Sequence, residues 1–301
     1  YKRQLYDGAV TTTAHMRSTE SLENLRLETD LSDTLEAELA ALADSFEELP
    51  LPIADGSYQV RTAADYAMLA GRGEVTEEQA QAAAAAFLDM DAARLQATGR
   101  SEGVVPCWNF AIDDGDDTSY IAVTVSGGEV LCYYSSCAGG EPALSTDEAV
   151  EAAAAFLRAR GYGGMRLIDT EDAGQSLICT FCYVQDNVLC TADQLRVRVR
   201  LDDGTVCGFS SALYLDTHRA RTLPTDTIGI EAGQAAVPGT LQVMDTRMAL
   251  LRLYGARETL CYEYLCETDD GQRCVIAVNA RTGQQERILT SDLAGGVQMQ
   301  F

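Results

Sequence analysis

Residues 195–209 read LRVRVRLDDGTVCGF, in which apolar and polar side chains alternate until a tight turn interrupts them. Alternation with a period of two places one kind of side chain on each face of a β-strand. Asp202, Asp203 and Gly204 form the turn, because glycine adopts at little cost the positive φ that tight hairpin turns require. The stretch therefore predicts a β-hairpin.

The same pattern occurs twice more, at intervals of about 70 to 80 residues. Residues 120–134 read YIAVTVSGGEVLCYY, and residues 274–289 read CVIAVNARTGQQERIL. Each copy has one β run, a turn that contains glycine, and a second β run. Self-similarity at a regular spacing indicates a repeated structural unit, which we expect to be present in three copies.

A helix is expected ahead of the first two hairpins. Thr76 with Gln79, and Ser145 with Glu148, have the spacing of a capping box at a helix start. The sequences that follow, QAQAAAAAFL and EAVEAAAAFL, are nearly the same. The third copy reads EAGQAAVP, in which the proline shortens the helix.

Further strands are expected between each helix and its hairpin, over residues 104–112, 177–184 and 260–267, with another around 247–254. A helix laid on one face of such an antiparallel sheet buries the apolar surfaces of both. The fold class is therefore predicted to be α+β. We expect three tandem helix-plus-antiparallel-sheet modules at residues 73–140, 141–222 and 223–301, preceded by a short helical segment at residues 1–72.

Within that first segment, residues 32–46 have the apolar spacing of a helix. Helices are also expected over residues 1–27 and 58–70, with prolines between them. No run approaches the roughly 20 apolar residues of a membrane helix, and no secretory signal is recognisable. We expect any anchor or export signal to lie upstream of Tyr1.

The charge balance restricts the class of partner. The chain has 46 acidic and 22 basic residues among 301, a formal net charge of −24. Such a chain repels nucleic acid and anionic membrane surfaces. We therefore expect no nucleic-acid partner, and membrane association only through an N-terminal anchor.

The cysteines are read as structural. Of the ten, only Cys179 and Cys182 have the CxxC spacing, and they lie in an expected strand. Positions i and i+3 of a strand point to opposite faces, so this pair cannot form a zinc knuckle. We expect most of the cysteines to be buried and to act as small apolar residues. Some structural disulfides are compatible with an extracytoplasmic setting, and the sequence leaves their connectivity undecided.

Motifs that carry chemistry are absent from the sequence. His15 and His218 are the two histidines, and there is no HExxH, GxSxG, GxGxxG or phosphate loop. The acidic stretch 113–117 resembles part of a calcium loop but lacks the closing glutamate, and is interpreted as a connecting loop. Carboxylate pairs are too frequent here to be informative, so a hydrolase acting through two carboxylates remains a minor alternative. We expect no enzyme activity, no cofactor and no metal.

The repeat unit resembles the PepSY domain, a helix plus a curved antiparallel sheet that is linked to regulation of extracytoplasmic hydrolases. The second and third copies resemble the C-terminal region of the YpeB family of spore germination proteins. The resembling stretches are GMR at 164–166, VRLDDGTVCGF at 199–209, YLDTHRAR at 214–221, LCYEY at 260–264 and VNARTGQQERIL at 278–289, with weaker likeness in LPL at 49–51 and ADYA at 64–67. We expect the helical N-terminal part to be much shorter than in that family.

The resemblance implies a location at the outward face of the spore inner membrane and a partner, a cortex-lytic hydrolase of the SleB type, that carries out the peptidoglycan hydrolysis. The expected function is therefore non-enzymatic: the chain stabilises or holds that hydrolase. The alternative is a general PepSY-type regulator or inhibitor of a secreted or membrane-associated peptidase, unrelated to spores. We expect the segment with Tyr214, His218, Arg219 and Arg221 to be exposed and to contact the partner.

Overall fold

The computed structural model describes residues 63–113, 119–137, 139–254, 257–290 and 298–299. The chain divides into two compact units, residues 1–60 and 61–301, and all described residues belong to the second. The helices expected over residues 1–27 and 32–46 lie outside the described residues, as does most of the acidic stretch 113–117.

The helix expected over residues 58–70 is wrong in its described part. The 3₁₀-helix η2 covers only Ala63–Asp65. Beyond it, the backbone amides of Ala67 and Met68 donate to the carbonyls of Asp216 and Leu215, so the chain leaves the helical hydrogen-bond pattern for a contact far away in sequence.

The first helix-and-strand group follows η2. Its elements are α4 (Glu77–Leu88), η3 (Ala92–Arg94), β1 (Leu95–Ser101), β2 (Cys107–Ile112), β3 (Tyr120–Thr124) and β4 (Val130–Tyr134). Strand β1, with the mostly polar sequence LQATGRS, was not expected, and the expected strand over 104–112 begins only at Cys107. Both capping boxes are confirmed, since Thr76 and Ser145 each exchange hydrogen bonds with the residue three positions on.

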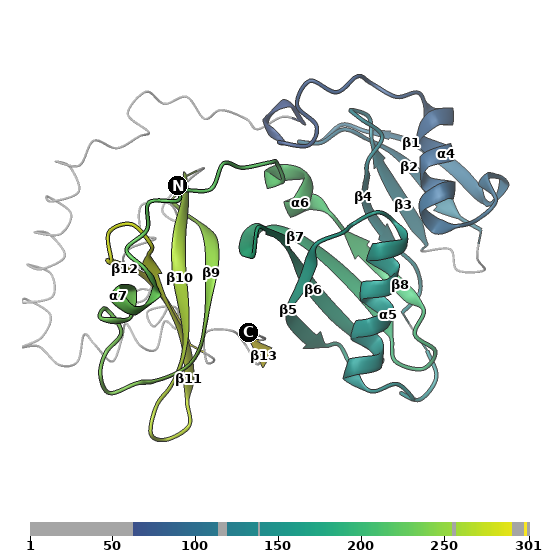
Figure 1. The fold of residues 1–301 in the computed structure, drawn as a ribbon. Coiled ribbons are helices and arrows are strands. Elements are labelled where there is room, and N and C mark those ends of the chain that lie inside the picture. Colours follow the sequence, from purple (N-terminus) through teal and green to yellow (C-terminus); the bar gives the residue numbers. More distant parts are fainter. Residues whose placement is uncertain (1–62, 114–118, 138, 255–256, 291–297, 300–301) are drawn as a thin grey trace, which may run out of the picture. The chain divides into compact units, whose positions relative to one another are not determined.

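The second and third groups continue the chain (Figure 1). The second contains α5 (Thr146–Ala159), β5 (Met165–Asp172), β6 (Ser176–Gln185), β7 (Val188–Arg200), β8 (Val206–Ser210) and α6 (Ala212–Thr217). The third contains α7 (Ile230–Gln234), β9 (Gln242–Tyr254), β10 (Arg257–Glu267), β11 (Arg273–Asn279) and β12 (Gln285–Thr290), and β13 (Gln298–Met299) pairs with β5. All three expected hairpins are confirmed as β3–β4, β7–β8 and β11–β12.

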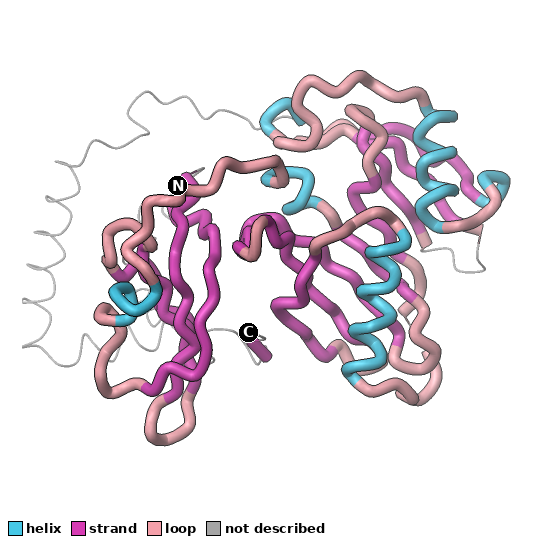
Figure 2. The backbone as a smooth tube through the Cα atoms, in the orientation of Figure 1, coloured by secondary structure: helices cyan, strands magenta, loops and turns pink. Residues whose placement is uncertain are grey.

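The described strands form one sheet of 13 strands, and helices are few (Figure 2), so the α+β class is confirmed. Strand β4 pairs antiparallel with β8, which joins the first group to the second. The start of β7 pairs parallel with β9, through Val188–Cys190 and Met248–Leu250, which joins the second group to the third. The division into three modules with the bounds given above stays a prediction.

One core lies under both long helices. Ala80 and Ala84 of α4, and Ala153 and Leu157 of α5, are buried together with apolar side chains of the strands beneath them. In the second half of β7, Leu195, Val197 and Val199 are buried and the arginines between them are not, as the alternation predicts.

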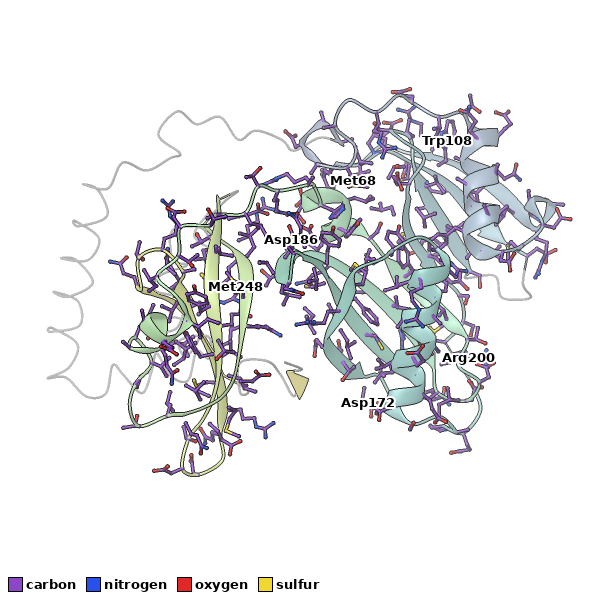
Figure 3. The ribbon with its side chains drawn as sticks, in the orientation of Figure 1. Met68, Trp108, Asp172, Asp186, Arg200 and Met248 are labelled. Atoms are coloured by element: carbon purple, nitrogen blue, oxygen red, sulfur yellow. A yellow bond between two sulfur atoms is a disulfide. The ribbon has the colours of Figure 1, made fainter. Side chains whose placement is uncertain are left out.

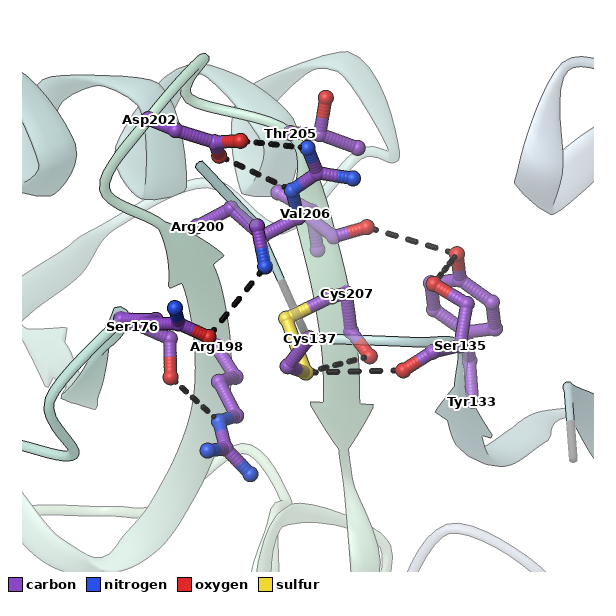
Figure 4. Close-up of a disulfide and its surroundings, with 12 residues drawn as sticks. Tyr133, Ser135, Cys137, Ser176, Arg198, Arg200, Asp202, Thr205, Val206 and Cys207 are labelled. Carbon is purple, nitrogen blue, oxygen red and sulfur yellow. Dashed lines mark hydrogen bonds and ion pairs between the residues drawn. A yellow bond between two sulfur atoms is a disulfide. The ribbon is translucent and has the colours of Figure 1, made fainter. Parts of the chain in front are cut away.

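The cysteine interpretation is largely confirmed. Cys179 packs in the core under α5, whereas Cys182 packs in a separate cluster with Leu189 and Cys261, so the two thiols of the CxxC point to opposite faces. One disulfide joins Cys137, which follows β4, to Cys207 on β8, across 70 residues (Figure 4). It lies at the junction of the first and second groups.

Candidate functional site

The site is built around a bend in β7. Tyr183 pairs with Cys190 and Cys182 pairs with Gln194, so the strand register skips residues 191–193 of β7. The part before the bend runs beside β9, and the part after it runs beside β8. Asp193 is the last residue of the bend, and its side chain is fully buried. Figure 3 shows the neighbourhood, with Asp186 at the β6–β7 turn and Met248 on β9.

Arg221 neutralises the buried Asp193 carboxylate. Its Nη1 donates to Asp193 Oδ2 at 2.7 Å and its Nη2 donates to Oδ1 at 2.8 Å, which makes the pair bidentate. Only 5% of the Arg221 side chain is exposed. The planar guanidinium suits this geometry, because its fork matches the two oxygens of a carboxylate.

A second carboxylate, from β10, approaches the same guanidinium. Arg221 Nε lies 3.0 Å from both oxygens of Glu258, and Nη2 lies 2.7 Å from Oε1. Arg221 also donates to the backbone carbonyls of Thr217 and Arg219. Each of its three nitrogens therefore has an acceptor, and the side chain ties β7, the segment after α6, and β10 together.

Asp193 receives two further hydrogen bonds. Thr217 Oγ1 donates to Oδ1 at 2.8 Å, and His218 Nδ1 lies 2.9 Å from Oδ2. The His218 ring is stacked on Tyr214 at 4.1 Å between centroids and meets the edge of Tyr183 at 4.6 Å. These contacts hold the imidazole with one nitrogen directed at the carboxylate.

The environment has opposing effects on the pKa of Asp193. Burial alone would raise this pKa, but the hydrogen bonds from His218, Arg221 and Thr217 outweigh burial and lower it below the ordinary value. For Arg221, burial would lower the pKa, whereas Glu258 and Asp193 together raise it. Both groups are therefore held in their charged forms.

The structure brings the four predicted partner-binding residues into this one place, here called the Arg221 network. It consists of Asp193, Thr217, His218, Arg219, Arg221 and Glu258, with Tyr214 stacked beside it. The expectation that the segment is exposed is wrong for Tyr214, His218 and Arg221. The reason is that α6 turns them inward against β7, where the ion pair offsets the cost of burying charge. Arg219 is exposed, at 52% of its side chain, and pairs with Glu258.

Sequence reasoning did not single out Asp193 and Glu258. Asp193 lies in the polar run Thr-Ala-Asp-Gln, which is typical of a solvent-facing strand edge. Glu258 lies near a chain turn and is 37 residues away from Arg221. One signal for these acceptors was present in the sequence: His218, Arg219 and Arg221 lie close together. Any of their side chains that is buried needs a hydrogen-bond acceptor.

The chemistry available to the network is ionic and structural. Asp193 accepts hydrogen bonds from three side chains, and Arg221 has its donors occupied. Across the residues that the structure describes, no group of three His, Cys, Asp or Glu side chains is placed to hold a metal ion. The network attaches the bend in β7 both to β10 and to the segment that follows α6.

A family model described as "YpeB sporulation, PepSY1 and PepSY2 domains" matches residues 35–224. The chain belongs to this family. The Sporulation protein YpeB of Halalkalibacterium halodurans is 27% identical to it, and the match covers 71% of this chain and 48% of the relative. The Sporulation protein YpeB of Bacillus subtilis is 29% identical, and the match covers 60% of this chain and 41% of the relative. The chain spans about half the length of the curated relatives it matches.

A solved structure shares the fold. The Bacillus megaterium YpeB C-terminal domain has a TM-score of 0.63 and 24% identity, and the alignment covers 72% of this chain and 98% of that chain. The YpeB family match includes Asp193 and ends three residues after Arg221, whereas Glu258 lies beyond it. No helix in the described ranges is both long and apolar enough to cross a bilayer.

Proposed function

We propose that this YpeB-family chain is a non-enzymatic, extracytoplasmic partner protein of spore germination, which holds or stabilises a cortex-lytic peptidoglycan hydrolase of the SleB type. The observation that carries the proposal is the family match, which spans the first two groups of helices and strands. The location proposed for it is the outer face of the spore inner membrane.

The geometry of the Arg221 network supports a scaffold role. His218, Arg219 and Arg221 of the 214–221 segment are engaged with Asp193 or Glu258, and the buried Arg221 is held in place by several hydrogen bonds. Such a network orders three chain segments and so fixes the surfaces around them. In this proposal three tandem helix-plus-sheet modules form the scaffold, and Arg219, the exposed member, contacts the hydrolase.

The test is a pull-down from spores with the tagged chain, together with hydrolase levels in a strain that lacks the gene. We expect the cortex hydrolase to be recovered and its level to fall in the deletion strain. Recovery of no cortex hydrolase, with unchanged levels in the deletion strain, would overturn the proposal. Recovery of a peptidase instead would favour the general PepSY-type regulator.

A charge-reversal pair sharpens the test. Arg219→Glu changes an exposed member of the network, and Arg158→Glu makes the same change on α5, where the side chain is 59% exposed and pairs with Glu151. We expect the first variant to recover less hydrolase than the second. Equal recovery by both variants would contradict a contact at Arg219.

A further inference from the structure

The alternation in β7 leaves a row of arginines on the face of the sheet opposite α5. Leu195, Val197 and Val199 are fully buried in the core beneath α5. The intervening Arg196, Arg198 and Arg200 therefore point to the other face. Alternate residues of a strand are spaced about 6.6 to 6.8 Å apart, so the row is regular.

Arg198, at the centre of the row, lies between small or apolar neighbours. It pairs with Gly208 on β8 and with Ile178 on β6. A Cβ atom at Gly208 would lie 3.1 Å from Arg198 Cβ, so the glycine leaves room for the arginine stem to cross the strand. Tyr134 pairs with Gly208 on its other side and stands next to Tyr120, with the rings 6.2 Å apart.

Arg198 lacks a carboxylate partner within the described part of the chain. Its Nε donates to Ser176 Oγ at 2.8 Å, and Ser176 is fully buried, so this bond fixes the guanidinium (Figure 4). No described Asp or Glu lies within ion-pair distance of it, in a chain with 46 acidic and 22 basic residues. No described residue accepts a hydrogen bond from either terminal nitrogen of Arg198, and both are open to an external acceptor.

The two flanking arginines differ in how firmly they are held. Arg200 pairs with Asp202 at 2.7 Å, and that carboxylate also accepts from the Gly140 amide. Arg196 pairs with Glu171 at 3.2 Å, and both side chains are about half exposed, 51% and 53%. An exposed pair of this kind contributes little to stability, so Arg196 can exchange Glu171 for another carboxylate.

We propose that Arg198, assisted by Arg196, binds carboxylates of an extended acidic segment of another protein on the face of the sheet opposite α5. Carboxylate is the ligand that matches the two terminal nitrogens of a fixed guanidinium. An extended polypeptide presents alternate side chains at the same spacing as Arg196 and Arg198. This inference goes beyond the proposed hydrolase partnership, because it concerns a surface outside the Arg221 network and specifies only the chemistry of the segment.

Binding at this face is expected to depend on salt. The net charge of −24 repels an acidic segment over most of the surface, so attraction is confined to the arginine row. Screening by salt at a partly exposed site weakens such an interaction.

The experiment uses the whole chain and a fluorescent peptide with glutamate at alternate positions, with a glutamine version as the control probe. Fluorescence anisotropy should show saturable binding of the glutamate peptide only. Arg198→Gln should weaken binding about tenfold or more, the scale of one charge-assisted bidentate contact. The matched control Arg158→Gln removes one charge from α5 and should leave binding unchanged.

Absence of saturable binding by the wild-type chain would overturn the inference, as would equal weakening by both variants, which would indicate a net-charge effect. Preference for an acidic polysaccharide over the peptide would overturn the polypeptide partner. A measurement without substitution covers the case in which Arg198→Gln fails to fold. The glutamate peptide should protect Arg198 of the wild-type chain from phenylglyoxal, read by peptide mapping, and unchanged modification would contradict binding there.

Discussion

Arg221 and Asp193, 28 residues apart in sequence, meet in a bidentate ion pair that is almost completely removed from solvent. Asp193 ends the bend in β7, and Arg221 follows α6. Because Glu258 of β10 binds the same guanidinium, one side chain joins strands from the second and third groups of the sheet. Each partner is buried only because the others neutralise it.

Arg221→Met should strongly destabilise the fold. The substitution keeps much of the side-chain volume but leaves the Asp193 carboxylate buried without its countercharge. Breaking a buried pair from one side costs about 3 to 5 kcal/mol. Urea unfolding, followed by circular dichroism, measures the change in free energy of unfolding.

Arg219→Met is the matched control for this prediction, since Arg219 pairs with the same Glu258 but is half exposed. We expect a loss of less than about 1 kcal/mol. Similar losses for the two variants would contradict the idea that burial of the Arg221–Asp193 pair sets the energetics.

The stability contributed by Asp193 should depend on pH in a defined direction. Its pKa is lowered in the folded state, so between the folded value and the unfolded value of about 3.9 the unfolded chain binds more protons. This contribution is therefore fully present above about pH 4 and is lost as the pH falls through the folded pKa.

The measurement compares the wild-type chain with Asp193→Asn from pH 7 to pH 2.5. The difference in free energy of unfolding should be constant at the upper end and shrink below about pH 4. A difference that grows on acidification would contradict a lowered pKa for Asp193.

The sequence predicted local features well. Capping boxes at Thr76 and Ser145 and three glycine-containing hairpins depend on neighbours a few residues away, and all are found. Features decided by distant contacts were missed. Strand β1 has a weak apolar pattern and is fixed by pairing with β2.

The Arg221 network illustrates the same limit. Residues at 214–221 could be recognised as unusual from the sequence, but whether they face solvent depends on where α6 packs. Their acceptors come from a strand bend and from β10, 24 to 39 residues away. Charge pattern along the chain carries no information on such pairings.

The Cys137–Cys207 disulfide should be detectable and stabilising. Without reductant, the denatured chain should show eight alkylatable thiols, since the eight other cysteines of the ten are free. Closing a loop of this size contributes about 4 kcal/mol in the chain-entropy account. The Cys137→Ser, Cys207→Ser double variant should therefore lose about 2 to 4 kcal/mol in chemical denaturation. Ten reactive thiols in the unreduced, denatured chain would contradict the bridge.

The free thiols should react slowly in the native chain. Burial raises the pKa of Cys107, Cys179 and Cys261 to about 12, so at pH 8 very little reactive thiolate is present. A thiol-specific disulfide reagent should label these positions rapidly only after denaturation, with mass spectrometry reporting the sites. Rapid native labelling of the three would show that the strands bearing them open readily.

Phe87 and Phe156 should be energetically coupled. They hold the same place in the repeated helix sequence, and they meet edge to face at 5.6 Å. Each also lies near Phe209 of β8, and the Arg160 guanidinium lies 3.5 Å from the Phe156 ring centroid. The contact therefore ties α4 and α5 to one core.

A double-mutant cycle tests this coupling. Phe87→Leu and Phe156→Leu are made singly and together, and the free energies of unfolding are compared. We expect an interaction energy of about 0.5 to 1.5 kcal/mol, the usual contribution of an aromatic pair beyond its buried area. A second cycle, which combines Ala85→Gly with Phe156→Leu, is the comparison. Its interaction energy should be smaller, because the Ala85 methyl group lacks the ring edge on which the coupling depends. Strict additivity for the two phenylalanines would show that the first and second groups are stabilised separately, despite the core that they share.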